Sequence, residues 1–99
     1  MDIVVADVSF ISLTRILPAC LRFLKPGGRL VVLVKPQFEL TPDKVGRGGV
    51  VREPAHQQEA VDKVTAFAQV ELGLVLVGVV PSKVKGPKGN QEYLACFQA

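Results

Sequence analysis

The sequence predicts an α/β fold in which strands and helices follow the order β-α-β-α-β-β. Three short apolar runs, at residues 3–6, 29–34 and 74–80, have the length and composition of strands buried inside a sheet. Two longer segments, residues 13–24 and 54–72, carry apolar side chains at spacings of three and four, which describes one face of a helix. Right-handed crossovers would make the first three strands parallel.

The first strand ends at Asp7, and the helix that follows begins after Ser12, a candidate N-cap. The sequence Lys-Pro-Gly-Gly at residues 25–28 ends this helix, because proline cannot continue it and glycine favours a helix end. Pro18 lies inside the helical pattern, so we expect it either to kink the helix or to mark its first turn.

The second strand ends at Lys35, because Pro36 has no N–H to donate to a neighbouring strand. Residues 37–53 then form a long connection, and connections of this length are typically functional loops or disordered segments. Pro54 opens the second helix and Gly73 ends it. The last strand, residues 92–97, follows a connection too short for a crossover helix, so it should run antiparallel to the third strand.

The composition is that of one small folded domain: 99 residues, 48% hydrophobic and 21% charged. A net charge of +3 permits an acidic partner such as RNA without requiring one. Cys20 and Cys96 lack metal-ligand spacing and have apolar neighbours, so we expect two reduced core residues in a cytoplasmic protein, with a disulfide as the alternative. No apolar run approaches the about 20 residues that a membrane helix needs.

Asp7 and Lys35 each follow a buried strand, so they should meet at the sheet rim where open α/β sheets bind ligands. Taken singly, Asp7 is more typical of a capping acid and Lys35 of a side chain that extends its amine into water. Together they predict a site in which a lysine accepts a proton from a hydroxyl group. Burial favours the neutral amine there, and the aspartate favours the ammonium.

Four segments in order, ADVSFISL, LVKPQFE, GRGGVVRE and GPKGNQEYL, resemble the TlyA (hemolysin A) family of FtsJ-like ribosomal RNA 2′-O-methyltransferases. The resemblance covers nearly the whole chain. It implies half of a Rossmann-like class I methyltransferase sheet with strand order 1-2-4-3. It also implies transfer of a methyl group from S-adenosylmethionine to a ribose hydroxyl by a Lys-Asp-Lys-Glu tetrad.

Matched to that tetrad, the catalytic residues are Asp7, Lys35 and Glu92, and Asp7 also faces the cofactor. Without the resemblance, Glu92 would be interpreted as a solvated residue at the end of a hairpin. The first lysine has no match among the 99 residues, and in the family it lies upstream, as do the glycine-rich cofactor loop and an S4 domain. We therefore expect residues 1–99 to be the C-terminal portion of the methyltransferase domain and inactive alone.

The alternative is a non-catalytic RNA-binding or protein-interaction module that has kept this half of the fold. The glycines of residues 46–49 match no dinucleotide-binding fingerprint, so we interpret them as part of a mobile loop. His56 is a polar residue at a helix start rather than a metal ligand. Ribosomal RNA is the expected partner, with phosphate contacts from Lys44, Arg47, Arg52, Lys83, Lys85 and Lys88; two solvated loops are an equally good explanation of these charges.

The strand order implied by the resemblance places residues 3–6 at an edge of the sheet. An apolar strand with an open edge can pair with another copy of the chain. We therefore expect self-association through the first strand.

Overall fold

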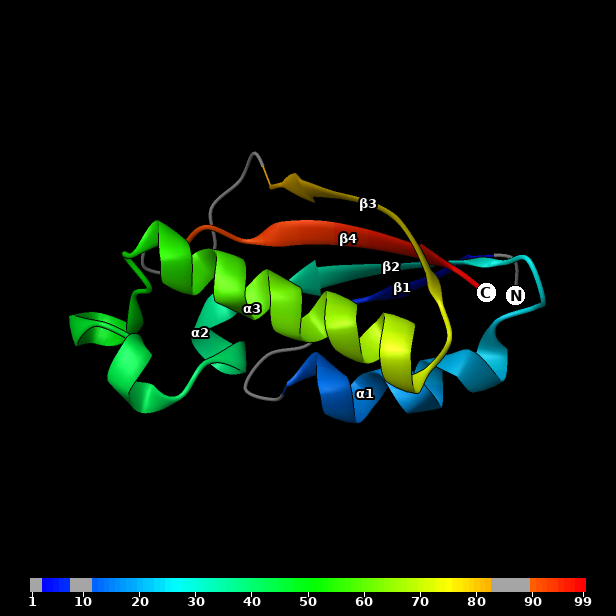
Figure 1. The fold of residues 1–99 in the computed structure, drawn as a ribbon, viewed down its shortest axis with the longest axis horizontal. Coiled ribbons are helices and arrows are strands. Elements are labelled where there is room, and N and C mark those ends of the chain that lie inside the picture. Colours follow the sequence, from blue (N-terminus) through cyan, green and yellow to red (C-terminus); the bar gives the residue numbers. More distant parts are fainter. Residues whose placement is uncertain (1–2, 8–11, 83–89) are drawn as a thin grey trace.

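The computed structural model describes residues 3–7, 12–82 and 90–99, and it confirms the predicted element order and sheet (Figure 1). The sheet has the strand order β1-β2-β4-β3, as expected. Strand β1 pairs parallel with β2, and β4 pairs antiparallel with both β2 and β3. The longer elements are β1 (Ile3–Ala6), α1 (Leu13–Cys20), β2 (Arg29–Val34), α3 (Pro54–Ala66), β3 (Val75–Pro81) and β4 (Tyr93–Gln98).

The core lies on one face of the sheet. Alternate residues of β2 (Leu30, Val32 and Val34) are fully buried, as the period of two in a strand requires. They form one cluster with Leu17 of α1 and Val64 of α3, so both helices pack against the same face. Apolar side chains elsewhere on the strands remain exposed, and the largest of these are Ile3, Val5, Val75, Val77, Val80 and Leu94.

The two helices begin and end largely where the sequence predicts. Ser12 caps α1, its hydroxyl oxygen accepting a hydrogen bond from the Thr14 N–H at 3.2 Å. Pro18 lies beyond the first turn of α1, and a 3₁₀ turn (Leu21–Phe23) continues the helix. Helix α3 continues as a π-helical turn (Phe67–Glu71), and Gly73 ends it at φ 67°, a left-handed conformation that favours glycine.

Residues 37–53 form the predicted long connection, and it contains short helical segments that the sequence did not indicate. They contain the end of a short helix, α2 (Pro36–Glu39), and two 3₁₀ turns, Pro42–Lys44 and Arg47–Gly49. In Figure 1 this segment, coloured green, lies at the end of the sheet where β2 ends.

Both cysteines are free, as the sequence predicts, but both are half-buried and neither is a buried core residue. Burial raises the pKa of the Cys20 thiol, so less of it is present as the reactive thiolate. In the part of the chain that the structure describes, no helix has the length and apolar character needed to cross a membrane.

Candidate functional site

The structure brings Asp7 and Lys35 together at one rim of the sheet. Strands β1 and β2 run parallel with Ala6 opposite Val32, so both chains leave the sheet on the same side. The Nζ of Lys35 lies 2.7 Å from Oδ1 of Asp7. The lysine side chain is 11% exposed and the aspartate side chain 58%. The predicted convergence is confirmed, with the amine largely buried and the carboxylate facing solvent.

The backbone around Lys35 explains why the strand ends on a lysine and a proline. Lys35 has an extended conformation and stands at the N-cap position of α2, where Pro36 is the first helical residue. Proline suits that position, because its missing N–H would have no partner inside the helix. The lysine is therefore held at a sharp change from strand to helix.

Glu92 lies at the same rim and is buried, only 5% exposed. Tyr93 is opposite Val34 in the antiparallel pair, so Lys35 and Glu92 follow at the same end of the two strands, one on each chain. The Nε2 of Gln37 donates to Oε2 of Glu92 at 3.5 Å. The interpretation of Glu92 as a solvated hairpin residue is therefore wrong, because its side chain is buried and bonds to Gln37.

Gln37 was not singled out from the sequence, although it lies in the segment LVKPQFE. Its Oε1 is buried and has no hydrogen-bond partner among the residues that the structure describes. Buried acceptors normally have a donor, so this oxygen marks the rim as a place where a further polar group fits.

Glu39, the carboxylate of the same segment, has a structural role that the sequence did not reveal. Its side chain is 1% exposed. It accepts hydrogen bonds from the Ser12 hydroxyl at 2.6 Å and from the Leu13 N–H at 2.8 Å. The Lys63 ammonium lies 3.3 Å from its Oε1. Glu39 thus joins α2 to the N-terminus of α1 and to α3, and it fixes the helix that begins directly after Lys35.

The structure describes only some of the basic residues predicted to bind RNA. Lys44 pairs with Glu59, with Nζ and Oε2 2.6 Å apart, and both side chains are partly exposed. Arg52 is exposed. The side chain of Arg47 and all of Lys83, Lys85 and Lys88 lie outside the described residues. His56 is half-buried, and the described residues contain no cluster of three His, Cys, Asp or Glu side chains that could hold a metal ion.

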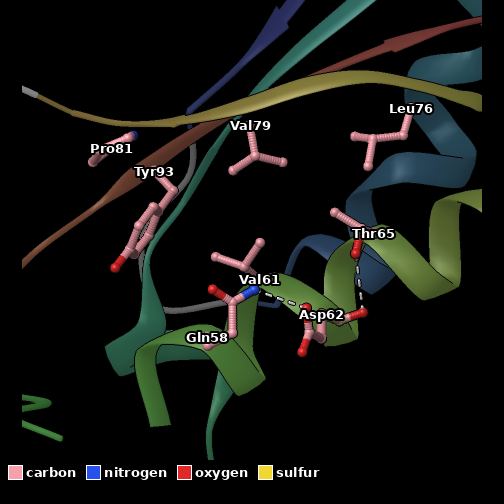
Figure 2. Close-up of a pocket in the computed structure, with 8 residues that line it drawn as sticks. All are labelled: Gln58, Val61, Asp62, Thr65, Leu76, Val79, Pro81 and Tyr93. Atoms are coloured by element: carbon pink, nitrogen blue, oxygen red, sulfur yellow. Dashed lines mark hydrogen bonds between the residues drawn. The ribbon is translucent and has the colours of Figure 1, made fainter. Parts of the chain in front are cut away.

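A cavity of about 310 Å³ lies between α3 and β3, apart from these residues (Figure 2). Val61 and Thr65 of α3 face Leu76 and Val79 of β3 across it, and Tyr93 closes one end. Neither Asp7, Lys35 nor Glu92 lines the cavity. We therefore place the candidate site at the rim and not in this cavity.

The fold and the rim define a Rossmann-like α/β domain with an acid and a lysine at the carboxyl ends of neighbouring parallel strands. The model of the FtsJ-like methyltransferase family matches residues 1–99. The chain belongs to this family.

Similar proteins agree with this assignment. The 16S/23S rRNA (cytidine-2'-O)-methyltransferase TlyA of Mycobacterium tuberculosis is 48% identical over 93 residues, which cover 94% of this chain and 34% of that protein. Hemolysin A of Brachyspira hyodysenteriae is 37% identical over 97% of this chain and 40% of its own length. A solved structure from Streptococcus thermophilus, named as a hemolysin, superposes with a TM-score of 0.92 at 43% identity, covering 98% of this chain and 34% of that one. The chain spans about a third of TlyA.

Proposed function

We propose that residues 1–99 form the C-terminal portion of a methyltransferase domain that acts on ribose 2′-hydroxyl groups of ribosomal RNA in the cytoplasm. The observation that carries the proposal is the pair of Asp7 and Lys35, 2.7 Å apart at the ligand-binding rim. The similarity to TlyA, whose name states cytidine-2′-O methylation of ribosomal RNA, supports this substrate.

In the proposed reaction, the Nζ of Lys35 accepts the proton of the attacking hydroxyl. A lysine can act in this way only as the neutral amine. The Lys35 side chain is 11% exposed, so its amine is held inside the site and not in solvent. Asp7 holds the amine in place and stabilises the ammonium that forms. Glu92, buried beside Gln37, orients the hydroxyl or the amine.

S-adenosylmethionine is the cofactor that the family uses in general, and it would supply an electrophilic methyl group. The described residues fit the reacting end of this molecule, because the Asp7 and Glu92 carboxylates favour the positive charge of a sulfonium. The 99 residues contain no match to the first lysine of the tetrad or to a glycine-rich cofactor loop. We therefore propose that the isolated chain does not bind this cofactor measurably.

A graft into a longer relative tests the function. The matching third of the Mycobacterium tuberculosis TlyA would be replaced by residues 1–99, and methylation of ribosomal RNA would be measured by mass spectrometry. We expect the graft to be active, and we expect Glu92→Gln in the graft to slow the reaction about a hundredfold or more. A folded graft without activity, or an unaffected Glu92→Gln variant, would contradict the proposal.

Titration calorimetry of the isolated chain against S-adenosylmethionine tests the proposal that residues 1–99 alone do not bind this cofactor. Measurable binding would refute it.

A protein-interaction role is the second candidate. Ile3 and Val5 on the edge strand β1 are 61% and 70% exposed, so an apolar strand edge is open to pairing. A second copy of the chain is the occupant we propose for it, giving a homo-oligomer through β1.

A further inference from the structure

We propose that Asn90 is a positioning residue that fixes the loop of residues 46–52 as a preformed RNA-contacting surface beside Glu92. This inference rests on the proposed function, because it assigns the RNA to a particular loop. Asn90 is 2% exposed and lies two residues before Glu92. One short segment therefore carries both the loop anchor and a residue of the candidate site.

Both polar atoms of the Asn90 side chain hold the loop. The Val51 N–H donates to Oδ1 of Asn90, and Nδ2 of Asn90 donates to the Gly49 carbonyl, each at 2.9 Å. An asparagine side chain can act in this way because its amide offers both an acceptor and donors. The Asn90 side chain therefore bonds the loop backbone as the backbone of a neighbouring strand would.

Helix α3 binds the other backbone group of Val51, its carbonyl. Nε2 of Gln57 donates to the Val51 carbonyl at 2.9 Å, and the Tyr93 hydroxyl donates to Oε1 of Gln57 at 3.2 Å. Both backbone groups of Val51 are thus bound by side chains, one from Gln57 on the following helix and one from Asn90, which is far away in the sequence. Buried backbone groups outside regular structure need such partners.

The main core does not explain why the chain fixes this loop so firmly. Val51 is 2% exposed but is not part of the hydrophobic cluster beneath the sheet. The loop contains three glycines, two of them at positive φ, and ordering glycine costs more conformational entropy than ordering any other residue. A function for the ordered shape accounts for this cost better than packing does.

The loop backbone also contacts the side chain of Arg52. A Cβ added at Gly46 would collide with Nη1 of Arg52 and would stand 2.8 Å from the Val50 carbonyl oxygen, so the guanidinium packs directly against the loop backbone. Arg47 belongs to the same loop. Because a rigid loop loses little entropy when it binds, fixing Arg52 on this loop favours contact with a charged backbone such as RNA.

The test is binding of a fluorescent RNA hairpin with cytidines in its loop, measured by anisotropy between about 50 and 200 mM salt. Asn90→Ala removes both bonds to the loop, and Gln57→Met removes the bond from α3 and keeps the side-chain length. We expect each variant to bind at least about fivefold more weakly. We also expect its plot of log affinity against log salt to flatten by about 0.7 per lost phosphate contact.

Gln58→Met is the matched control, because Gln58 is the neighbouring glutamine and, among the described residues, bonds only to Asp62 on the same helix. It should bind as the wild type does. If the Asn90→Ala variant does not fold, the Gln57→Met variant alone tests the inference. Folded variants with wild-type affinity, or with weaker binding at an unchanged salt slope, would overturn the inference. If the wild type itself does not bind this RNA, the inference fails, while the activity of the graft still decides the proposed function separately.

Discussion

At the scale of single residues, the sequence predicts the Asp7–Lys35 pair but not its neighbours. The pair follows from one rule, because residues after parallel strands meet at one rim. The position of Glu92 depends on the register of β4 against β2, and no local pattern determines that register. The place of Glu92 in the site was predicted only through the family resemblance. Glu39 was missed because its partners, Ser12 and Lys63, are distant in the sequence.

Glu39→Ala should destabilise the fold strongly. The substitution leaves the buried Leu13 N–H without an acceptor and removes a charged partner of Ser12 and Lys63. We expect the free energy of unfolding to fall by about 3 kcal/mol in urea denaturation followed by circular dichroism.

Glu59→Ala is the control for this change. Its carboxylate also pairs with a lysine, Lys44, but both side chains are partly exposed, so the loss should stay under about 1 kcal/mol. Equal losses for the two variants would show that Glu39 does not clamp the helices together.

At the scale of elements, every predicted strand and both long helices form, because their apolar periodicity reflects burial directly. The turns of residues 42–44 and 47–49 were not predicted. The second turn is held by Asn90, which bonds the Gly49 carbonyl and the Val51 N–H, and contacts between residues so distant leave no local pattern in the sequence. The π-helical end of α3 was likewise not predicted.

Gly73→Ala tests the end of that helix. Gly73 has φ 67°, and a side chain in this conformation is strained even where space is open, as it is here. The free energy of unfolding should fall by about 1 kcal/mol in the same denaturation experiment. Gly78→Ala on β3 provides the comparison, since it also meets open space but is not among the residues at positive φ. If the Gly73→Ala variant is as stable as the Gly78→Ala variant, a side chain at position 73 is not strained.

At the scale of the whole molecule, the helices cover one face of the sheet while β1 remains an edge with two exposed apolar side chains. The chain also matches only about a third of TlyA. An open apolar edge of this kind favours pairing between copies.

Val5→Lys should therefore reduce self-association. Val5 is 70% exposed on β1, and a charge there repels a second copy and hinders strand pairing. Sedimentation velocity over a range of concentrations should show an oligomer for the wild type and a shift toward monomer for the variant. Val70 is 78% exposed but lies on the π-helical turn, so the Val70→Lys variant should behave like the wild type. A wild-type chain that stays monomeric at high concentration would rule out this interaction.

The central claim is that Lys35 accepts the proton during methyl transfer to RNA. The most direct test is the single-turnover rate of methyl transfer by the graft described above, compared with its Lys35→Ala variant. Loss of a general base should slow the reaction by about 10² to 10⁴, with an unchanged circular dichroism spectrum. A Lys35→Ala graft that methylates ribosomal RNA at the full rate would contradict the claim.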